Sequence, residues 1–224
     1  MRKFQYVPKE ERNTKNENKA LMYSNQMMKS NFNQYGCVNL IDDYQKILND
    51  GCIYLPNYFC QTDNLDIFNK LKLEVGNQQA INWSKHMKYE NPEFSETFNN
   101  IVMLMAKKFN VKVVQTRLNY YHNGLDYKPF HHDSNAYGNK IENFTMGASF
   151  GDSRELVFLH DETQNKFTFP QNNGDIFAFN KEINKKFMHG VPNKQSKTSS
   201  TSTSTQSKST SERFSIIAWG TLIE

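Results

Sequence analysis

The chain has 224 residues, a formal net charge of +4, and a hydrophobic content of only 37%. This length suits one domain with a sizeable core, and the lack of any long apolar run argues against a membrane-spanning helix. Three cysteines, an odd number without C-x-x-C spacing, argue against a disulfide scaffold or a zinc site and favour an intracellular location, cytoplasmic or nuclear.

Two segments have compositions that bury too little apolar surface to fold. Residues 1–35 are rich in Asn, Lys, Glu and Gln, without the apolar stretch of a secretory signal peptide. Residues 194–212 are a Ser/Thr-rich low-complexity tract. We therefore expect a disordered segment at 1–35 and one domain at 36–224, in which residues 194–212 form an expanded surface loop. A monomer is assumed, because the sequence does not indicate an oligomeric state.

Two helices are expected before the β-rich part of the chain. Residues 51–75 predict a short strand and then a helix capped by Asp63. Residues 91–109 predict a second helix, with Asn91 as its N-cap and Pro92 in its first turn. Apolar residues recur at helical spacing in both segments: Leu65, Ile67, Phe68 and Leu71, then Phe94, Phe98, Ile101, Val102 and Met105.

From residue 111 onward the chain changes to short runs rich in β-branched and aromatic residues. Turn signals such as Asn123-Gly124 and Asn173-Gly174-Asp175 separate the runs. Many short strands with turns between them indicate a barrel or a double-sheet jelly roll, and the preceding helices must cover one face of it. The predicted strands span residues 111–121, 143–151, 154–162, 165–171, 175–180 and 213–220.

His131 and Asp133 form the most informative pair in the chain. In an extended segment residues i and i+2 share a face, so these side chains converge while His132 points outward or bonds to a neighbour of the site. With the distant His189 they make two imidazoles and one carboxylate, the set that holds non-haem Fe(II) and leaves positions open. H-x-D alone is a weak pattern, and a surface His-His-Asp turn is the alternative.

The order H-x-D, distant His and R-x-S resembles the Fe(II)/2-oxoglutarate dioxygenases, and the surrounding sequence is most similar to their AlkB-like branch. The resemblance covers residues 50–224. It implies an α+β fold, a double-stranded β-helix (jelly roll) with N-terminal covering helices, and a metal site for Fe(II) with 2-oxoglutarate and O2 as co-substrates. The matching segments are Asn119-Tyr120-Tyr121, Gly174-Asp175, His189-Gly190-Val191-Pro192 and Arg213-Phe214-Ser215.

Arg213 and Ser215 share one face of the last predicted strand. An Arg fork can hold a carboxylate with two hydrogen bonds and a hydroxyl can add a third, which in the family fixes the distal carboxylate of 2-oxoglutarate. Asn119 and Tyr121 alternate onto one face and are further candidates for the co-substrate site, although Tyr121 can equally be a core residue. One departure is Trp219, which stands where many AlkB-type proteins carry a second arginine.

Four residues are candidates for contacts with a substrate. Trp83 and His86 lie between the predicted helices and could stack on a nucleobase, the alternatives being core packing and solvation. Tyr137 either lines a pocket mouth or packs, and Lys185 either contacts phosphate or lies in water.

With a pI near 8.8, these features suggest a methylated nucleic acid as partner and oxidative demethylation as the reaction. The alternatives are a hydroxylase of a protein side chain or small molecule, and a non-catalytic jelly-roll binding module.

Overall fold

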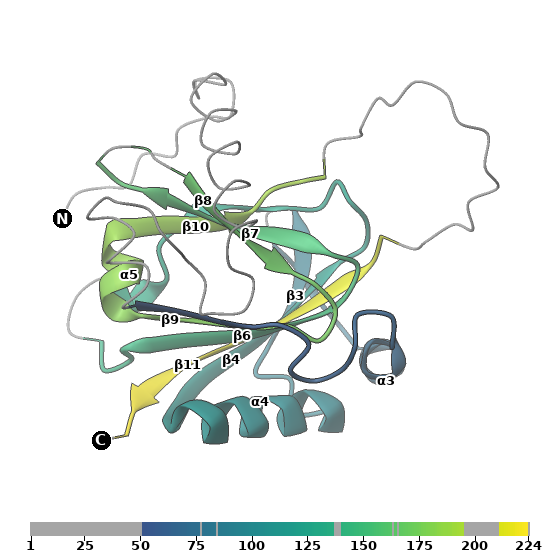
Figure 1. The fold of residues 1–224 in the computed structure, drawn as a ribbon. Coiled ribbons are helices and arrows are strands. Elements are labelled where there is room, and N and C mark those ends of the chain that lie inside the picture. Colours follow the sequence, from purple (N-terminus) through teal and green to yellow (C-terminus); the bar gives the residue numbers. More distant parts are fainter. Residues whose placement is uncertain are drawn as a thin grey trace, which may run out of the picture.

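The computed structural model describes residues 51–76, 78–83, 85–136, 140–162, 164, 166–194 and 211–223. The predicted disordered segment, residues 1–35, and residues 195–210 of the predicted loop lie outside these ranges. The described residues form two antiparallel sheets that face each other, one with seven strands and one with four (Figure 1). In this part of the chain, no helix combines the length and apolar character needed to cross a membrane.

The larger sheet has the strand order β1-β9-β6-β11-β4-β3-β2. The long strands β4 and β11 lie at its centre and pair antiparallel, which places residues from two distant parts of the chain side by side. The strands are β1 (Cys52–Leu55), β2 (Ile81–Trp83), β3 (His86–Glu90), β4 (Val111–Tyr121), β6 (Phe144–Gly151), β9 (Ile176–Asn180) and β11 (Arg213–Leu222).

The smaller sheet has the order β5-β10-β7-β8. Its strands are β5 (Lys128–His131), β7 (Arg154–His160), β8 (Lys166–Gln171) and β10 (Phe187–Val191). Two facing antiparallel sheets confirm the predicted double-sheet domain, and the described residues are mostly β-strand with few helices. Each predicted run after residue 110 corresponds to a strand whose ends lie within two residues of the predicted ones, whereas β2, β3, β5 and β10 are not among those runs.

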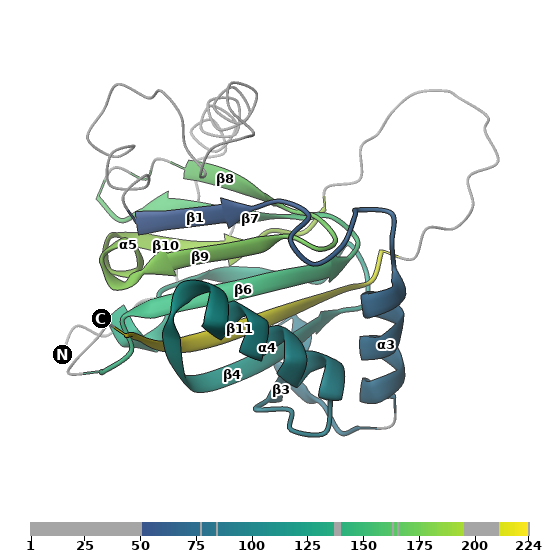
Figure 2. The same cartoon turned by 60° about the horizontal axis from the view of Figure 1, so that its bottom comes forward.

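Helices α3 (Asp66–Val75) and α4 (Glu96–Phe109) lie on the outer face of the larger sheet (Figure 2). Apolar side chains of the helices pack there against alternate residues of β4, β6, β9 and β11. The predicted stripes need two corrections, because Leu65 and Phe94 are 44% and 40% exposed. A second, mostly aromatic cluster consists of Cys52, Tyr54, Phe158, Phe167, Phe169, Phe177, Phe179, Ile183 and Phe187.

The predicted helix caps are both wrong. Ser95 caps α4, because its Oγ accepts a hydrogen bond of 3.0 Å from the backbone N–H of Phe98. Asn91 instead lies in the left-handed region with φ 43°, and its Oδ1 accepts from the N–H of Thr116. Asp63 is not the cap of α3, whose N-cap is Leu65 without a side-chain bond.

Replacing Ser95 with alanine should lower the free energy of unfolding by about 0.5–2 kcal/mol, the usual value of an N-cap hydroxyl. The loss should lie toward the upper end, because the buried Ser95 hydroxyl also donates to Glu74 of α3. Urea unfolding measures this change. Asn100→Ala, at an exposed position inside α4, is the matched control and should leave stability unchanged or slightly raised. Equal losses in the two variants would contradict the assigned cap.

Candidate active site

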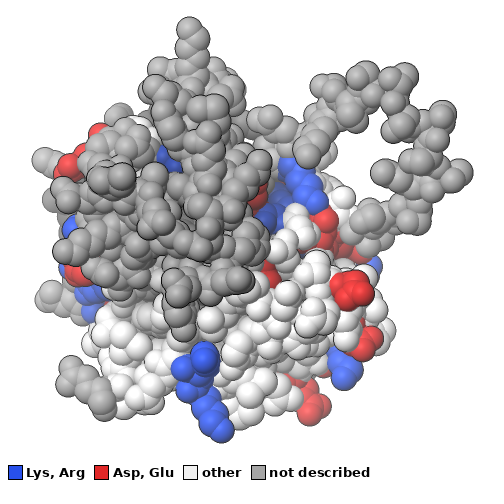
Figure 3. Space-filling view, in the orientation of Figure 1, with Lys and Arg blue, Asp and Glu red and all other residues white. Residues whose placement is uncertain are grey.

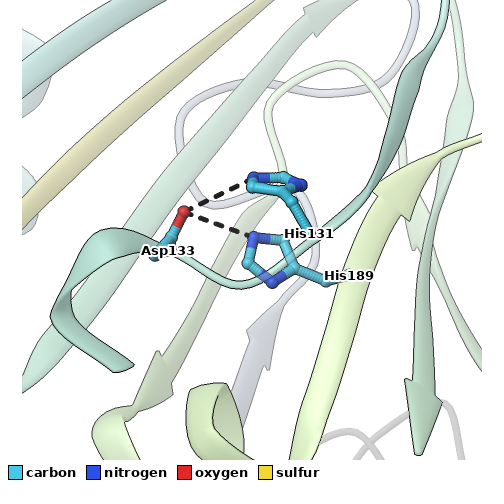
Figure 4. A group of neighbouring side chains, drawn as sticks. All are labelled: His131, Asp133 and His189. Atoms are coloured by element: carbon cyan, nitrogen blue, oxygen red, sulfur yellow. Dashed lines mark ion pairs between the residues drawn. The ribbon is translucent and has the colours of Figure 1, made fainter. Parts of the chain in front are cut away.

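Strands β5 and β10 bring His131 and His189 together. The two residues are direct partners in the antiparallel register, so their rings lie on one face with centroids 4.4 Å apart. Asp133 follows β5 and precedes the short helix η2 (Ser134–Ala136). Its Oδ1 lies 3.5 Å from Nε2 of each histidine (Figure 4). One possible ligand atom from each of the three residues lies within 4.8 Å of the other two, so the predicted triad converges.

Hydrogen bonds hold the other polar atoms of His131 and Asp133, whereas Nδ1 of His189 is buried without a hydrogen-bond partner among the described residues. Nδ1 of His131 lies 3.0 Å from the carbonyl oxygen of Pro129 and can donate to it, which leaves Nε2 as an acceptor. Thr145 donates from its hydroxyl to the other carboxylate oxygen of Asp133 at 3.1 Å. Two imidazole nitrogens and one free carboxylate oxygen fit an Fe(II) ion with coordination positions left open.

Electrostatics keep these ligands in the forms that bind metal. Burial and the neighbouring His189 lower the pKa of His131 to about 4. Burial acts to raise the pKa of Asp133, but His189 and His131 outweigh it and hold that pKa well below its usual value. At neutral pH the site therefore offers a neutral His131 and an ionised Asp133.

His132 and Asn184 fix the segment that carries Asp133. The Oδ1 of Asn184, in helix α5 (Lys181–Lys186), accepts from the N–H of Asp133 at 2.9 Å, and its Nδ2 donates to the carbonyl of Asp133 at 3.1 Å. His132 bonds through Nδ1 to the carbonyl of Asn184, and its Nε2 lies 3.0 Å from Asp161. The buried side chain of His132 thus connects the triad segment to α5 and to Asp161. No sequence motif identifies Asn184 as a residue of this site.

Arg213 begins β11 and is buried in the same region. Its Nε donates to Ser149 at 2.9 Å, its Nη2 lies 3.4 Å from Gln171, and its guanidinium carbon lies 5.1 Å from the ring centre of Tyr121. Its Nη1 is buried without a hydrogen-bond partner among the described residues. Burial lowers the pKa of Arg213 to about 10, so the group remains a cation at neutral pH. A buried guanidinium with an unused donor fits a carboxylate ligand.

The strand register explains why Arg213 shares a cavity with the other predicted residues. Arg213 pairs with Tyr121 and Ser215 pairs with Asn119 across β11 and β4, so all four side chains lie on the inner face. A cavity of about 70 Å³ between the sheets is lined by these four residues together with His131, Asp133 and His189.

The candidate substrate residues behave differently from one another. His86 is 3% exposed, its ring stacks on Tyr121 with centroids 5.0 Å apart, and its Nε2 lies 3.2 Å from Oδ1 of Asn119. The alternative of a solvated His86 is therefore wrong. Lys185 is exposed and pairs with Glu182 at 2.8 Å, and neither His86 nor Lys185 is among the described residues that line the cavity. Trp83 pairs with His86 in the β2–β3 register, and Tyr137 lies outside the described residues.

His86 should make stability depend on pH. Burial and the positive charge of Lys128 lower its pKa from 6.5 to about 4. Between these values the unfolded chain binds more protons than the folded one, so the free energy of unfolding falls as pH drops from 6.5 toward 4, by up to about 1.4 kcal/mol per pH unit. Urea unfolding of metal-free protein across this range measures the slope.

His86→Gln can retain a hydrogen bond to Asn119 but does not titrate. The dependence of the free energy of unfolding on pH should therefore weaken by up to about 1.4 kcal/mol per pH unit, the contribution of one proton. His131 contributes in the same direction and gives a residual slope in that variant. An unchanged slope in His86→Gln would show that His86 is already protonated at these pH values.

Other cavity residues are absent from the sequence interpretation. Thr145 bonds to Asp133 of the triad, and Gln171 lies beside Arg213. Arg117 and Lys128 also line the cavity. Arg117 lies two positions before Asn119 on β4, so strand alternation alone could have predicted that both side chains lie on the same face of the sheet. Gln171 at the end of β8 has no such signal, because its approach to Arg213 depends on how the two sheets stack.

Comparison with known proteins shows a family match and a shared fold. A family model described as the 2OG-Fe(II) oxygenase superfamily matches residues 69–218. An uncharacterized protein, R406, of Acanthamoeba polyphaga mimivirus is 26% identical over 159 residues, which cover 60% of this chain and 82% of the viral protein.

Two solved structures have similar folds at low identity. OsALKBH1 is 14% identical with a TM-score of 0.51, over 76% of this chain and 96% of that one. A Trichoplax adhaerens prolyl hydroxylase, solved with a peptide fragment of hypoxia inducible factor, is 10% identical with a TM-score of 0.54, over 93% of this chain and 91% of that one. At such identities the structures show the fold alone.

Proposed function

The chain belongs to the 2OG-Fe(II) oxygenase superfamily, and on this basis we propose that it is an AlkB-like dioxygenase that oxidises methylated nucleic acid. The family membership makes it an oxidoreductase that uses Fe(II), 2-oxoglutarate and O2. The observation that carries the site assignment is one cavity lined by His131, Asp133 and His189 and also by the buried Arg213.

In this proposal the iron is held by Nε2 of His131, Nε2 of His189 and a carboxylate oxygen of Asp133. Arg213 and Ser215 bind the distal carboxylate of 2-oxoglutarate. When bound, the iron and its co-substrates supply the oxidation, in which 2-oxoglutarate and O2 yield succinate and CO2 and the second oxygen atom enters a C–H bond of the substrate. An N-methyl substrate then becomes an N-hydroxymethyl product, which releases formaldehyde and leaves the N–H group.

The neighbouring side chains orient the ligands and exclude water. Thr145 donates a hydrogen bond to one carboxylate oxygen of Asp133. The side chain of Asn184 bonds to both the backbone N–H and the backbone carbonyl of Asp133. Asn119 and Tyr121 line the co-substrate part of the cavity. The ring of His86 stacks on Tyr121, and its Nε2 is within hydrogen-bond distance of Oδ1 of Asn119. The apolar walls Phe177 and Phe179 keep this region dry, which strengthens its electrostatic interactions.

The AlkB-like assignment is supported by sequence. The N-x-Y pair Asn119 and Tyr121 and the H-x-V-P segment from His189 to Pro192 have the family's order, and these residues meet at one cavity or beside it. Trp219 departs from the pattern, since the second arginine is missing there. Hydroxylation of a protein side chain is the second candidate, because the prolyl hydroxylase neighbour has the same fold and was solved with a bound peptide.

Substrate-dependent turnover separates these functions. Purified protein with Fe(II) and 2-oxoglutarate is incubated with N-methylated single-stranded oligonucleotides, with the same oligonucleotides unmethylated, and with a proline-containing peptide. We expect succinate release stimulated only by the methylated oligonucleotides, with formaldehyde in equal amount, and no release by Asp133→Ala. Stimulation by the peptide without formaldehyde would replace the nucleic-acid proposal with protein hydroxylation.

A further inference from the structure

His86 is a buried histidine that contacts two cavity residues from behind, without lining the cavity itself. It begins β3, and β4 lies between β3 and β11 in the larger sheet. Its ring stacks on Tyr121 with an interplanar angle of 12°, and its Nε2 lies 3.2 Å from Oδ1 of Asn119. Burying an imidazole costs free energy unless the ring makes favourable contacts, and both of these contacts are to residues of the candidate co-substrate site.

The hydrogen bond between His86 and Asn119 determines where the imidazole carries its hydrogen. Oδ1 of Asn119 can only accept, so Nε2 of His86 must donate. Nδ1 of His86 is buried and has no hydrogen-bond partner among the described residues. The backbone carbonyl of Tyr127 acts to raise the pKa of His86, but burial and the charge of Lys128 outweigh it and lower that pKa to about 4. At neutral pH the ring is therefore neutral, with its single hydrogen on Nε2.

This direction of the hydrogen bond sets the orientation of the Asn119 amide. With Oδ1 turned toward His86, the NH2 group on the other side of the amide carbon faces away from the ring. Asn119 lines the cavity, so the group that its amide can offer to a ligand is a hydrogen-bond donor. The opposite orientation would offer a carbonyl oxygen, which repels a carboxylate.

The strand register places Asn119 between the two ends of the candidate site. Asn119 pairs with Ser215, which lies two residues after Arg213 on β11. Thr145, whose hydroxyl donates to Asp133 of the triad, pairs four residues further along the same strand. A co-substrate that reaches from Arg213 to the iron must therefore pass the level of Asn119.

We propose that His86 is a positioning residue, which holds the Asn119 amide so that its NH2 group donates to an oxygen of 2-oxoglutarate. This inference rests on the proposed dioxygenase function and adds to it a residue that lies behind the cavity wall. Because the amide is oriented before the co-substrate arrives, binding does not have to select one of its two orientations. His86 then supports co-substrate affinity without touching the co-substrate.

Two variants separate the hydrogen bond of His86 from its stacked ring. His86→Phe keeps an aromatic ring against Tyr121 but has no donor, whereas His86→Gln has a donor for Asn119 but no ring. Calorimetric titration of Mn(II)-loaded protein with 2-oxoglutarate measures the affinity without turnover. We expect an affinity about three- to tenfold weaker than wild type in His86→Phe, as for the loss of one hydrogen bond, and within about twofold in His86→Gln.

A double-mutant cycle shows whether the effect acts through Asn119. Asn119→Ala alone should weaken 2-oxoglutarate binding, and His86→Phe should cause no further loss in that background. If the role of His86 were merely structural, His86→Phe would cause the same loss in both backgrounds.

Controls assign the measured affinities to the cavity. Met87→Leu changes the next residue of β3, whose side chain lies on the opposite face of the strand, and should leave affinity within about twofold of wild type. On the described part of the face in Figure 3, Lys and Arg lie in separate small groups among acidic and uncharged residues, so a dianion meets no broad basic surface there. Thermal unfolding of each variant verifies that it is folded before titration.

The tautomer of His86 tests the proposal without any ligand. Heteronuclear NMR distinguishes protonated from unprotonated imidazole nitrogens, and the signals that His86→Gln lacks are those of His86. In metal-free protein at neutral pH we expect the hydrogen on Nε2 and none on Nδ1.

Three results would overturn the proposal. These are a hydrogen on Nδ1 of His86 in place of Nε2, wild-type affinity for 2-oxoglutarate in His86→Phe, or an equal loss from His86→Phe with and without Asn119. Failure of the proposed function is a different result, in which wild-type protein with Mn(II) does not bind 2-oxoglutarate although His86 carries its hydrogen on Nε2.

Discussion

Replacing Asp133 or His189 with alanine should abolish Fe(II) binding, with a loss of affinity of more than about 100-fold. Removing a partner that only orients a ligand typically costs 10–100-fold, so removing a ligand should cost more. The three candidate ligand atoms lie within 4.8 Å of one another, and either substitution leaves only two of them to bind the ion. The measurement is anaerobic titration with Fe(II), followed by separation and iron analysis, and we expect one ion per chain in wild type and none in the variants.

His132→Ala is the matched control, because His132 stands between two ligands in the chain and its imidazole bonds elsewhere. It contacts the carbonyl of Asn184 and the carboxylate of Asp161 and lies buried on the α5 side. We expect this variant to retain most iron binding while unfolding at a lower temperature. Equal loss of iron in all three variants would contradict the ligand assignment.

Replacing Arg213 with alanine should have the second largest effect, on 2-oxoglutarate affinity. Losing one partner of a buried charge-assisted pair costs about 2–5 kcal/mol, which corresponds to a roughly 30-fold to several-thousand-fold weaker affinity. The buried Nη1 of Arg213 without a partner among the described residues is the donor that this carboxylate would use. Calorimetric titration of Mn(II)-loaded protein with 2-oxoglutarate measures the change.

Two further variants locate the effect at the guanidinium fork. Arg213→Lys keeps the charge but loses the paired donors, so its affinity should lie between wild type and Arg213→Ala. Trp219→Ala removes a buried ring on the same strand face and should lower stability more than co-substrate affinity. Normal 2-oxoglutarate binding by Arg213→Ala would show that the R-x-S pair has another role.

The strands that sequence patterns identify are those rich in β-branched and aromatic residues. Strand β4 spans the predicted residues 111–121, and Arg213 and Ser215 share a face as alternation requires. Strands β5 and β10 are missed as elements because they are short and carry Pro129 and Gly190, which weaken any strand pattern. Their pairing still brings His131 opposite His189, a long-range register that local patterns do not encode.

The site residues that escaped prediction depend on contacts between distant segments. Asn184 acts on Asp133 from α5, and Gln171 reaches Arg213 from the opposite sheet. The cap of α4 moved from Asn91 to Ser95 because Asn91 adopts a left-handed conformation that bonds to β4. Motif order thus sufficed to predict that His131, Asp133, His189 and Arg213 lie at one site, whereas the side chains that contact them required the three-dimensional arrangement.

We propose that one cavity holds both the iron and the 2-oxoglutarate that carry out the oxidation. The most direct measurement is the conversion of 2-oxoglutarate to succinate by purified protein with O2, with and without Fe(II). We expect Fe(II)-dependent succinate formation that is lost in both Asp133→Ala and Arg213→Ala and retained in His132→Ala. Succinate formation that needs no iron, or that persists in Asp133→Ala, would contradict it.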